Sequence, residues 1–359
     1  MMEISRFEGI PELTIGLDVS DRSLRYCELD RSGEIVGEGK LALRRAELHR
    51  YLKSQPCRAR VALEAGGHAA WIRDEIEAAG HEALVANARD LAAVTGRSHR
   101  TDRSDARQIA RLARVDARLL HPVELRSACA QADLFVIRAR AGLVEVRTKL
   151  INMARGMTKV TGERLPDSRT DRFAGRMRDA MPDVLCAALD PLLAVLEKVS
   201  EQIAELDEEL ERLAERQYPE TRWLTQVPGV GTLTALTYVL TIGNPRRFAR
   251  SRDAGPVLGL SPGKRASGEQ DPQLGISKCG DRYLRTLLIQ CAHRVLGPHS
   301  PDSALRQWGL EHARGGKAAK RVAVTAVARR LAVLLHRLWV RQEVYRVFPM
   351  AVETGAVAQ

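Results

Sequence analysis

The most constraining feature of this sequence is a run of apolar residues that recur every three or four positions. The run comprises Leu189, Leu192, Leu196, Val199, Ile203, Leu206, Leu210 and Leu213. Steps that alternate between three and four place one apolar seam along a helix, as in the heptads of coiled coils. A second helical pattern covers residues 124–155. The seam can pack against that helix as an in-chain hairpin, against another subunit, or against both.

The region before the seam alternates between strand and helix patterns. Strand-like runs cover residues 14–19, 23–30, 34–41, 60–64 and 82–86, and helical patterns cover 45–53 and 68–79. The turn signal Arg31-Ser32-Gly33 separates the second and third runs. This alternation predicts a mixed α/β sheet.

The region after the seam has mainly helical patterns, at residues 232–242, 281–296 and 317–345. A loop rich in Gly, Pro and Ser covers residues 255–280. We therefore expect an α/β domain at 12–123, a helical coiled-coil region at 124–218, a mainly α domain at 219–346 and a tail at 347–359.

The positive charge of the chain is concentrated near its C-terminus. The net charge is +11, and residues 246–346 carry 20 Lys and Arg against 7 Asp and Glu. One basic region of this kind is typical of a protein that binds a polyanion. The alternative is a soluble, arginine-rich protein from a GC-rich genome. Aromatic residues are only 4% of the chain, so we expect contacts to the backbone of an RNA or RNA–DNA duplex more than base stacking.

Membrane and secreted classes are disfavoured. No apolar run reaches membrane-spanning length, and Glu3 and Glu8 interrupt any apolar start, so we expect a cytoplasmic protein without a signal peptide. The six cysteines form no CxxC pair, which predicts reduced and mostly buried thiols.

Four acidic residues form a candidate metal site. Asp18 and Glu64 end two predicted strands, and Asp102 and Asp105 lie three apart in the stretch RTDRSDARQIARLARV. Strand-end carboxylates converge at one edge of a sheet, and a cluster of acids is costly unless a cation neutralises it. Oxygen ligands of this kind favour Mg²⁺, while Arg100 and Arg103 would hold nucleic acid. The alternative is an ordinary ion-paired helix start, because acids are common in any chain.

Several stretches of the sequence resemble one known family. TIGLDVSDRSLRYCELD, VALEAGGHAAWI and RTDRSDARQIARLA in the first half, and QVPGVGTLTALTYVLTIGNPRRF and AGPVLGLSPGKRASGEQDPQLGISKCGDRYLRTLL in the second, occur in matching order. They resemble the DEDD transposases of the insertion sequence one-hundred-and-ten family. The resemblance implies a RuvC-like, ribonuclease-H-type N-terminal domain with Mg²⁺ at the four acids named above. The sequence departs from the family pattern at Ala65-Gly66, where members more often carry Thr-Gly.

The resemblance also implies a nucleophilic serine in the C-terminal domain. The candidates are Ser261, Ser267 and Ser277. Ser267 follows Lys264-Arg265, whose charges would stabilise phosphorus oxygens, and it matches the family's Ser-Gly position. A solvated loop serine is the alternative.

Further residues are candidates for contacts with nucleic acid. Gly229 and Gly231 in the sequence Pro-Gly-Val-Gly resemble a helix-hairpin-helix turn, whose backbone amides can face a phosphate. Arg246 and Arg247 follow this turn. A helical stripe of Lys278, Arg282 and Arg285 is also expected to face phosphates. The alternatives are a plain glycine turn and solvated helix faces.

The resemblance thus implies a transposase that cuts and rejoins DNA through a phosphoserine. The resemblance implies that a structured bridge RNA guides it to donor and target double-stranded DNA, and that a homodimer pairs into a tetramer on DNA. Two alternatives remain. One is a metal-dependent nuclease or junction resolvase that only hydrolyses DNA, and the other is a non-catalytic nucleic-acid scaffold.

Overall fold

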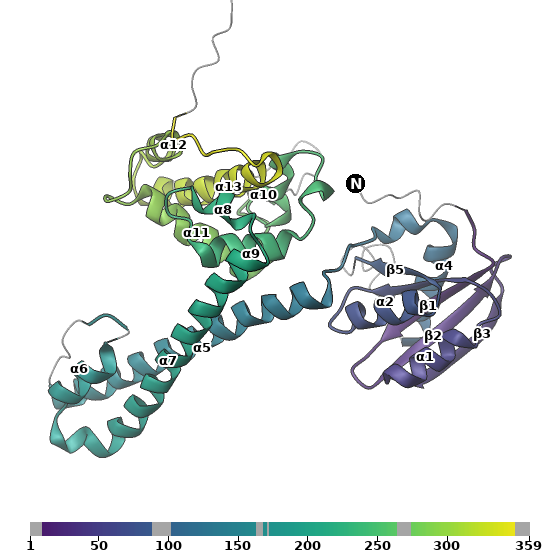
Figure 1. Cartoon of the computed structure of the whole chain (residues 1–359), viewed down its shortest axis with the longest axis horizontal. Helices are drawn as coiled ribbons and strands as arrows, with labels where there is room; N and C mark the ends of the chain where they lie inside the picture. Colours follow the sequence, from purple (N-terminus) through teal and green to yellow (C-terminus); the bar gives the residue numbers. More distant parts are fainter. Residues whose placement is uncertain (1–8, 88–101, 163–167, 171, 264–273, 349–359) are drawn as a thin grey trace, which may run out of the picture. The chain divides into compact units, whose positions relative to one another are not determined.

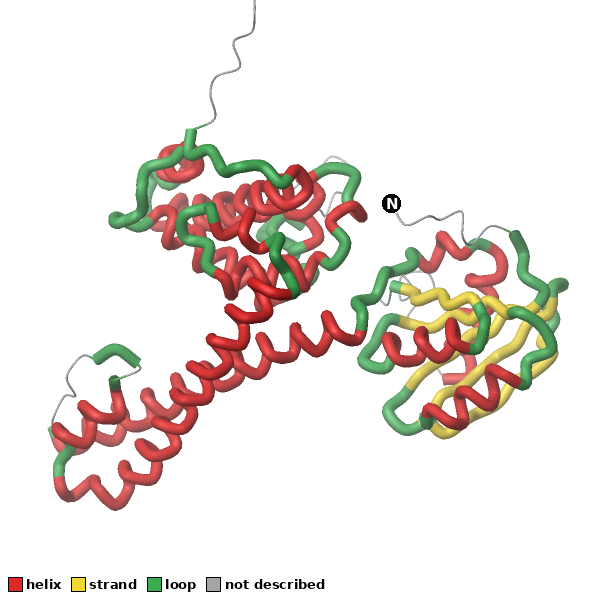
Figure 2. Tube along the Cα trace, viewed as in Figure 1, coloured by secondary structure: helices red, strands yellow, loops and turns green. Residues whose placement is uncertain are grey.

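The computed structural model of the chain describes residues 9–87, 102–162, 168–170, 172–263 and 274–348 (Figure 1). The chain divides into two compact units, Met1–Ala130 and Gln131–Gln359. The first contains a five-stranded sheet, and the described part of the second is mainly helical (Figure 2).

The sheet of the first unit is mixed, with the strand order β3-β2-β1-β4-β5. The central strand β1 (Leu13–Val19) pairs antiparallel with β2 (Ser23–Asp30), which pairs antiparallel with β3 (Ile35–Ala42). On its other side β1 pairs parallel with β4 (Ala59–Glu64), which pairs parallel with β5 (Glu82–Ala86). The five strands lie within a residue of the predicted ones. This mixed sheet is consistent with the RuvC-like domain that the sequence predicts.

Helices cover both faces of this sheet. The alternation of side chains along β1 directs Leu13, Ile15 and Leu17 into one core, which α1 (Arg45–Lys53) and α2 (Ala69–Ala78) cover. Helix α4 (Asp102–Val115) covers the other face. There Ile109 and Ala113 of α4 pack on Ala62 of β4 and on Leu84 and Ala86 of β5.

The second unit begins with a helical hairpin, in which α5 (Ala128–Thr158) and α7 (Cys186–Arg216) are joined through α6 (Phe173–Ala180). At the hairpin tip, Ile151, Phe173, Met177, Leu189 and Leu193 share a core. Seam residues of α7 that are buried within the single chain are Leu189, Leu196, Ile203, Leu210 and Leu213. The in-chain packing of this seam is therefore present, and a contact of the seam with another subunit stays a prediction.

The remaining helices form a second core within this unit. They are α8 (Thr221–Thr225), α9 (Thr232–Ile242), α10 (Ala254–Val257), α11 (Arg282–Leu296), α12 (Ala304–His312) and α13 (Lys317–Arg341). Tyr238 of α9 is fully buried, and its hydroxyl donates to the Ala332 carbonyl of α13 at 2.7 Å. Helix α13 ends four residues before the predicted end at 345, because Gln342 takes a left-handed conformation with φ of 52°.

The cysteines are all free thiols, but the prediction that most are buried is wrong. Cys27 and Cys291 are buried, Cys129 is exposed, and the other three lie between these extremes. Within the described ranges, no helix is both long and apolar enough to span a membrane.

Candidate active site and nucleic-acid interface

Asp18 and Glu64 lie at the ends of two neighbouring parallel strands. Leu17 of β1 pairs with Leu63 of β4, so the next residue on each strand is one of the two carboxylates. Successive side chains point to opposite faces of a sheet, so both carboxylates lie on the face away from these two leucines. That is the face covered by α4. Asp18 is half-buried and Glu64 is exposed.

Helix α4 runs opposite in direction to β1 and β4. Its last turn lies near the start of β4, where the Arg60 guanidinium donates to the Ala113 carbonyl at 3.1 Å. Its middle lies over the centre of β1, where Gly16 approaches Ala106 and Ala110. The first turn of α4 therefore points toward the strand ends that carry Asp18 and Glu64.

The two aspartates predicted on a helix both fall in this first turn. Asp102 begins α4, and Asp105 follows three residues later and is half-buried. The side chains of Asp102 and Arg103 lie outside the described part of the structure, as does the whole of Arg100. The fold thus brings the backbone positions of all four predicted acids toward one edge of the sheet.

Ion pairs and hydrogen bonds fix α4 against the sheet. The Arg107 guanidinium makes two hydrogen bonds to the carboxylate of Glu38 on β3, one of them at 2.8 Å. Arg114 donates to the carbonyl of Arg31 in the β2–β3 turn at 2.6 Å. These two arginines of the basic stretch therefore hold the helix in place.

The oxygen donors at this edge fit a hard divalent cation. Carboxylates from two adjacent strands and one helix turn are the ligand type that Mg²⁺ takes in proteins. Among the side chains that the structure describes, no three acidic, histidine or cysteine groups lie close enough to hold a metal ion. Asp102 is not among those side chains, so this finding covers an incomplete set of the four acids.

The predicted serine loop is carried on a short two-stranded stem. Pro262 and Ile276 form an antiparallel bridge, the Gly263 amide donates to the Gly275 carbonyl at 2.9 Å, and the Ser277 amide donates to the Ser261 carbonyl at 2.9 Å. Residues 264–273 connect the two sides of the stem. Lys264, Arg265 and Ser267 belong to this connection and lie outside the described residues.

The buried side chain of Arg285 binds the backbone at the base of this stem. It is only 8% exposed, and its guanidinium donates to the carbonyls of Leu258 at 3.2 Å and Cys279 at 2.7 Å. Gly259 also packs closely against the backbone of Cys279, since a Cβ at Gly259 would lie 2.3 Å from the Cys279 carbonyl oxygen. Arg285 thus has an internal structural role in place of the phosphate contact expected from its helical spacing.

The other predicted phosphate contacts have different environments. Lys278 and Arg282 are exposed, and Asp281 between them caps α11 by accepting from the Leu284 amide at 2.7 Å. The α8–α9 turn contains Gly229, with φ of 91°, and Gly231, the N-cap of α9. Such a turn leaves the first amides of α9 available to an anion.

Arg246 and Arg247 lie in a short 3-10 turn after α9. The Asn244 side chain caps this turn by accepting from the Arg246 amide at 3.0 Å. Arg246 is exposed and Arg247 is half-buried, with its guanidinium 4.8 Å from the Phe248 ring centroid. Arg246 is therefore the more accessible of the two to a phosphate.

Two residues that position the site were missed by the sequence interpretation. The pattern at 14–19 includes Gly16 only as one residue of a strand, although a glycine inside a strand often marks a close backbone approach. The helical spacing predicts that Arg285 faces phosphates. Its position among Leu284, Leu287 and Leu288 on α11 was a signal that it lies on the buried face.

Comparison with known proteins gives matches in both units. The DEDD transposase family of IS110 elements, described as "Transposase", matches residues 15–161, and the "Transposase IS116/IS110/IS902 family" matches residues 221–308. The first match includes Asp18, Glu64, Asp102 and Asp105. The second includes Ser267 and the stem that carries its loop.

Relatives match over nearly the whole chain. A "Probable family 20 transposase" of Pseudomonas aeruginosa is 30% identical over 92% of this chain and 98% of its own length. The "Transposase for insertion sequence element IS1111A" of Coxiella burnetii is 28% identical over 92% of this chain and 91% of its own. The "Transposase for insertion sequence element IS1328" of Yersinia enterocolitica is 28% identical over 79% of this chain and 84% of its own length. The chain therefore belongs to the IS110 family of DEDD transposases, which are DNA-recombining enzymes.

Proposed function

We propose that this transposase cuts and rejoins DNA through a covalent phosphoserine at Ser267, assisted by Mg²⁺ at a site formed by Asp18, Glu64, Asp102 and Asp105. The observation that supports this proposal is the geometry of the first unit. Neighbouring parallel strands end in Asp18 and Glu64, and α4 runs back toward the same edge with two aspartates in its first turn.

The four carboxylates would hold the cation by their oxygens. A bound Mg²⁺ supplies positive charge that stabilises a phosphodiester as its bonds rearrange. The protein's part is to fix the carboxylates on backbone elements that cannot move independently. Strand pairing fixes Asp18 against Glu64, and the packing of α4 on Gly16 fixes the helix turn above them.

In the proposed reaction the hydroxyl oxygen of Ser267 attacks a DNA phosphorus. A new P–O bond to the serine forms while the P–O bond to the leaving strand breaks, and the proton lost by the serine is regained by the leaving oxygen. The number of phosphoester bonds is unchanged, so rejoining by the reverse attack needs no nucleotide cofactor. Lys264 and Arg265 would stabilise the charge on the non-bridging oxygens.

The same proposal includes a guide and a multimer. A structured bridge RNA would pair with donor and target double-stranded DNA, so that base pairing selects the sequence while the protein recognises duplex shape. A homodimer that pairs into a tetramer would combine the acidic site of one subunit with the serine of another. The basic C-terminal region supports binding of both nucleic acids, with 20 Lys and Arg against 7 acids in residues 246–346.

A covalent-adduct assay tests this function directly. Purified protein, RNA transcribed from the flanks of its own element, labelled donor and target DNA, and Mg²⁺ are mixed and then denatured. We expect a protein–DNA adduct with the wild type and none with Ser267→Ala, whereas Ser277→Ala should still form it. Cleavage without an adduct, unaffected by Ser267→Ala, would instead identify a nuclease that hydrolyses DNA with its carboxylates alone. Binding without any cleavage in the wild type would favour a scaffold.

A further inference from the structure

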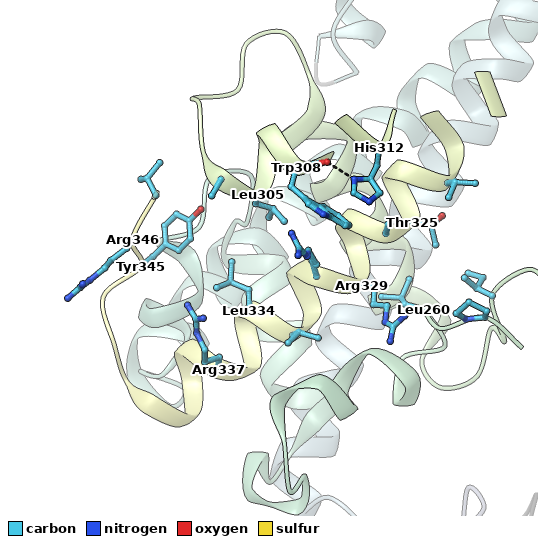
Figure 3. Close-up of a pocket in the computed structure, with 18 of the residues that line it drawn as sticks. Leu260, Leu305, Trp308, His312, Thr325, Arg329, Leu334, Arg337, Tyr345 and Arg346 are labelled. Atoms are coloured by element: carbon cyan, nitrogen blue, oxygen red, sulfur yellow. Dashed lines mark hydrogen bonds between the residues drawn. The ribbon is translucent and has the colours of Figure 1, made fainter. Parts of the chain in front are cut away.

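A large groove lies among the C-terminal helices, beside the stem of the serine loop. It has a volume of about 1630 Å³ and is bounded by α12, by one face of α13, by the segment after α13 and by the sides of the serine-loop stem (Figure 3). Its lining combines two chemical types, arginines and apolar side chains. This combination indicates a ligand with both charged and apolar parts.

The charge of the groove is strongly positive. The arginines that line it are Arg321, Arg329, Arg330, Arg337, Arg341 and Arg346. All six are exposed, and Glu343 is the one acidic residue among the described residues of the lining. Its carboxylate lies 2.8 Å from the Arg337 guanidinium and 3.9 Å from that of Arg341, so it is shared between these two. Among the residues that the structure describes, the acids of the lining therefore balance only part of this arginine charge, which favours an anionic ligand.

One arginine of the groove is held in place by an aromatic ring. The guanidinium of Arg330 on α13 stacks on the indole of Trp308 on α12, 3.8 Å from the ring centroid. The imidazole of His312 lies 4.1 Å from the same indole, and its Nδ1 is 2.8 Å from the Trp308 carbonyl oxygen (Figure 3). A stacked guanidinium keeps its N–H edge available, so it can bind a phosphate with little further loss of side-chain freedom.

The floor between the charged residues is apolar. Leu305 from α12 and Leu334 from α13 line it, with Leu260 at one end (Figure 3). Val333 of α13 and Ile276 of the stem also belong to the lining. A DNA duplex presents its phosphates outward and stacks its bases inside, so its bases cannot contact an apolar floor of this kind. A single strand presents phosphates and unstacked bases together, and arginines beside apolar and aromatic surface match both.

We propose that this groove binds single-stranded DNA. The chain is a DNA-recombining transposase, and cutting and exchanging strands exposes unpaired DNA that a recombinase must retain until it is rejoined. Phosphates would contact Arg329, Arg330 and Arg337, and bases would lie on Leu334 and around the Trp308–Arg330 stack. Base contacts would then matter here, although aromatic residues are scarce in the chain as a whole. The inference does not depend on Ser267 or on the acidic site, because binding is measured without cleavage.

The first test is binding of the full-length protein to fluorescein-labelled oligo-dT of about 20 nucleotides, longer than a typical single-strand site. The groove variant carries Arg329→Gln and Arg330→Gln. The matched control carries Arg212→Gln and Arg216→Gln, which remove two exposed arginines from α7 and change the net charge equally. We expect the groove variant to bind at least tenfold more weakly at physiological salt, and the control to change less than threefold. At roughly 0.7 per phosphate contact, the salt slope should fall by about 1.4 in the groove variant alone.

The second test places the DNA at the groove. Oligo-dT that contains 5-iodouracil is irradiated with the protein and the adduct is digested with trypsin. We expect cross-linked peptide 307–314, which contains Trp308, and loss of this adduct in Trp308→Leu while the adduct persists in Trp223→Leu. Trp308→Phe should retain most of the binding.

Several results would overturn the inference. Equal binding by the groove and control variants would do so, as would cross-links that avoid peptide 307–314. Competition by a DNA duplex as effective as by oligo-dT would show that the groove recognises only phosphate charge. Preferential competition by oligo-U would assign it to RNA. Because Ser267→Ala protein should bind oligo-dT like the wild type, failure of the serine mechanism and failure of this inference are separately visible.

Discussion

Gly16 of β1 and Ala106 of α4 are in direct backbone contact. A Cβ atom at Gly16 would lie 2.2 Å from the Ala106 carbonyl oxygen and 2.5 Å from the Ala110 amide nitrogen. Only a residue without a side chain allows α4 to approach the sheet this closely. The contact lies two residues before Asp18 on β1, so it sets how near the first turn of α4 comes to the strand ends.

Gly16→Ala should therefore damage both stability and activity. The added methyl group has backbone atoms in its way, so α4 must move outward, and overpacking of this kind costs about 1–3 kcal/mol of unfolding free energy. The shift carries Asp102 and Asp105 away from the strand ends. We expect at least a tenfold loss of Mg²⁺-dependent strand cleavage, with the urea midpoint measured alongside.

Gly66→Ala is the matched control, because it lies just after Glu64 and a Cβ there would have no atom within 4 Å. It should leave both the midpoint and the cleavage rate near those of the wild type. Wild-type cleavage by Gly16→Ala protein would show that the position of α4 does not govern the acidic site.

Removing single carboxylates tests the metal site more directly. Asp18→Asn and Asp102→Asn each replace a charged ligand with a neutral amide of the same shape, which weakens cation binding without altering the fold. We expect strand cleavage with Mg²⁺ to fall by a hundredfold or more while DNA affinity, measured by anisotropy, stays within threefold. Asp21→Asn removes a fully exposed carboxylate just beyond β1 and should cleave normally. Unchanged cleavage in Asp102→Asn would contradict the proposed site.

The sequence predicted the strands and helices well because their patterns are local. The alternation in β1 and the seam of α7 each reflect one buried face, and a buried face can be recognised without knowing what covers it. The convergence of Asp18 and Glu64 was also predicted, since both lie at the ends of predicted strands of an α/β sheet, but the direct parallel pairing of their strands was not. The partner of the α7 seam was not predictable, because the same apolar face fits an in-chain helix or a second subunit.

The role of Arg285 could not be predicted from spacing alone. Lys278, Arg282 and Arg285 fit one helical stripe, yet α11 begins only at Arg282 and buries Arg285 against the stem of the serine loop. A helical pattern shows which residues share a face, but the tertiary packing decides whether that face meets solvent. The same limit applies to the groove, because its arginines come from α13 and the segment after it, whereas its leucines come from α12, α13 and the region of the serine-loop stem.

Arg285→Met should loosen the serine loop without unfolding the domain. Methionine fills much of the buried space but cannot donate to the Leu258 and Cys279 carbonyls, which loses about 1–3 kcal/mol of stability. We expect adduct formation at Ser267 to fall by tenfold or more, and trypsin to cleave within residues 258–280 faster than in the wild type. Arg282→Met, an exposed arginine on the same helix, should leave loop proteolysis unchanged. If both variants behave alike, Arg285 does not position the loop.

The α7 seam offers a test of subunit contact. Ile203 is buried within the chain, whereas Val199 and Leu206 on the same seam are only half-buried and have surface left for a partner. Ile203→Ala should lower the unfolding free energy by about 2–4 kcal/mol and leave the sedimenting mass unchanged. Val199→Asp combined with Leu206→Asp should reduce the mass toward that of a monomer. A wild-type mass in the double variant would mean that the seam serves only the hairpin.

The last prediction concerns pH and the buried His336 of α13. Its Nε2 lies 2.9 Å from the Pro245 carbonyl oxygen, which can only accept, so Nε2 carries the proton and Nδ1 accepts from the Ser251 hydroxyl at 3.0 Å. Burial is the main cause that lowers the pKa of His336 below its ordinary value of 6.5. The nearby charge of Asp253 acts in the opposite direction on this pKa, and that of Arg247 lowers it further.

The pKa of His336 is lower in the folded protein than in the unfolded chain. As the pH falls, His336 therefore takes up a proton in the unfolded chain before it does so in the folded protein. The stability from neutral His336 is therefore fully present above about pH 6.5 and is lost as the pH falls through that value toward the folded pKa. We expect the urea midpoint to fall between about pH 7.5 and pH 5.5, and to fall less in His336→Gln, whose side chain does not titrate in this range. His293→Gln, which alters an exposed histidine on α11, should keep the wild-type pH dependence. Equal slopes in the wild type and His336→Gln would assign the acid sensitivity to other groups.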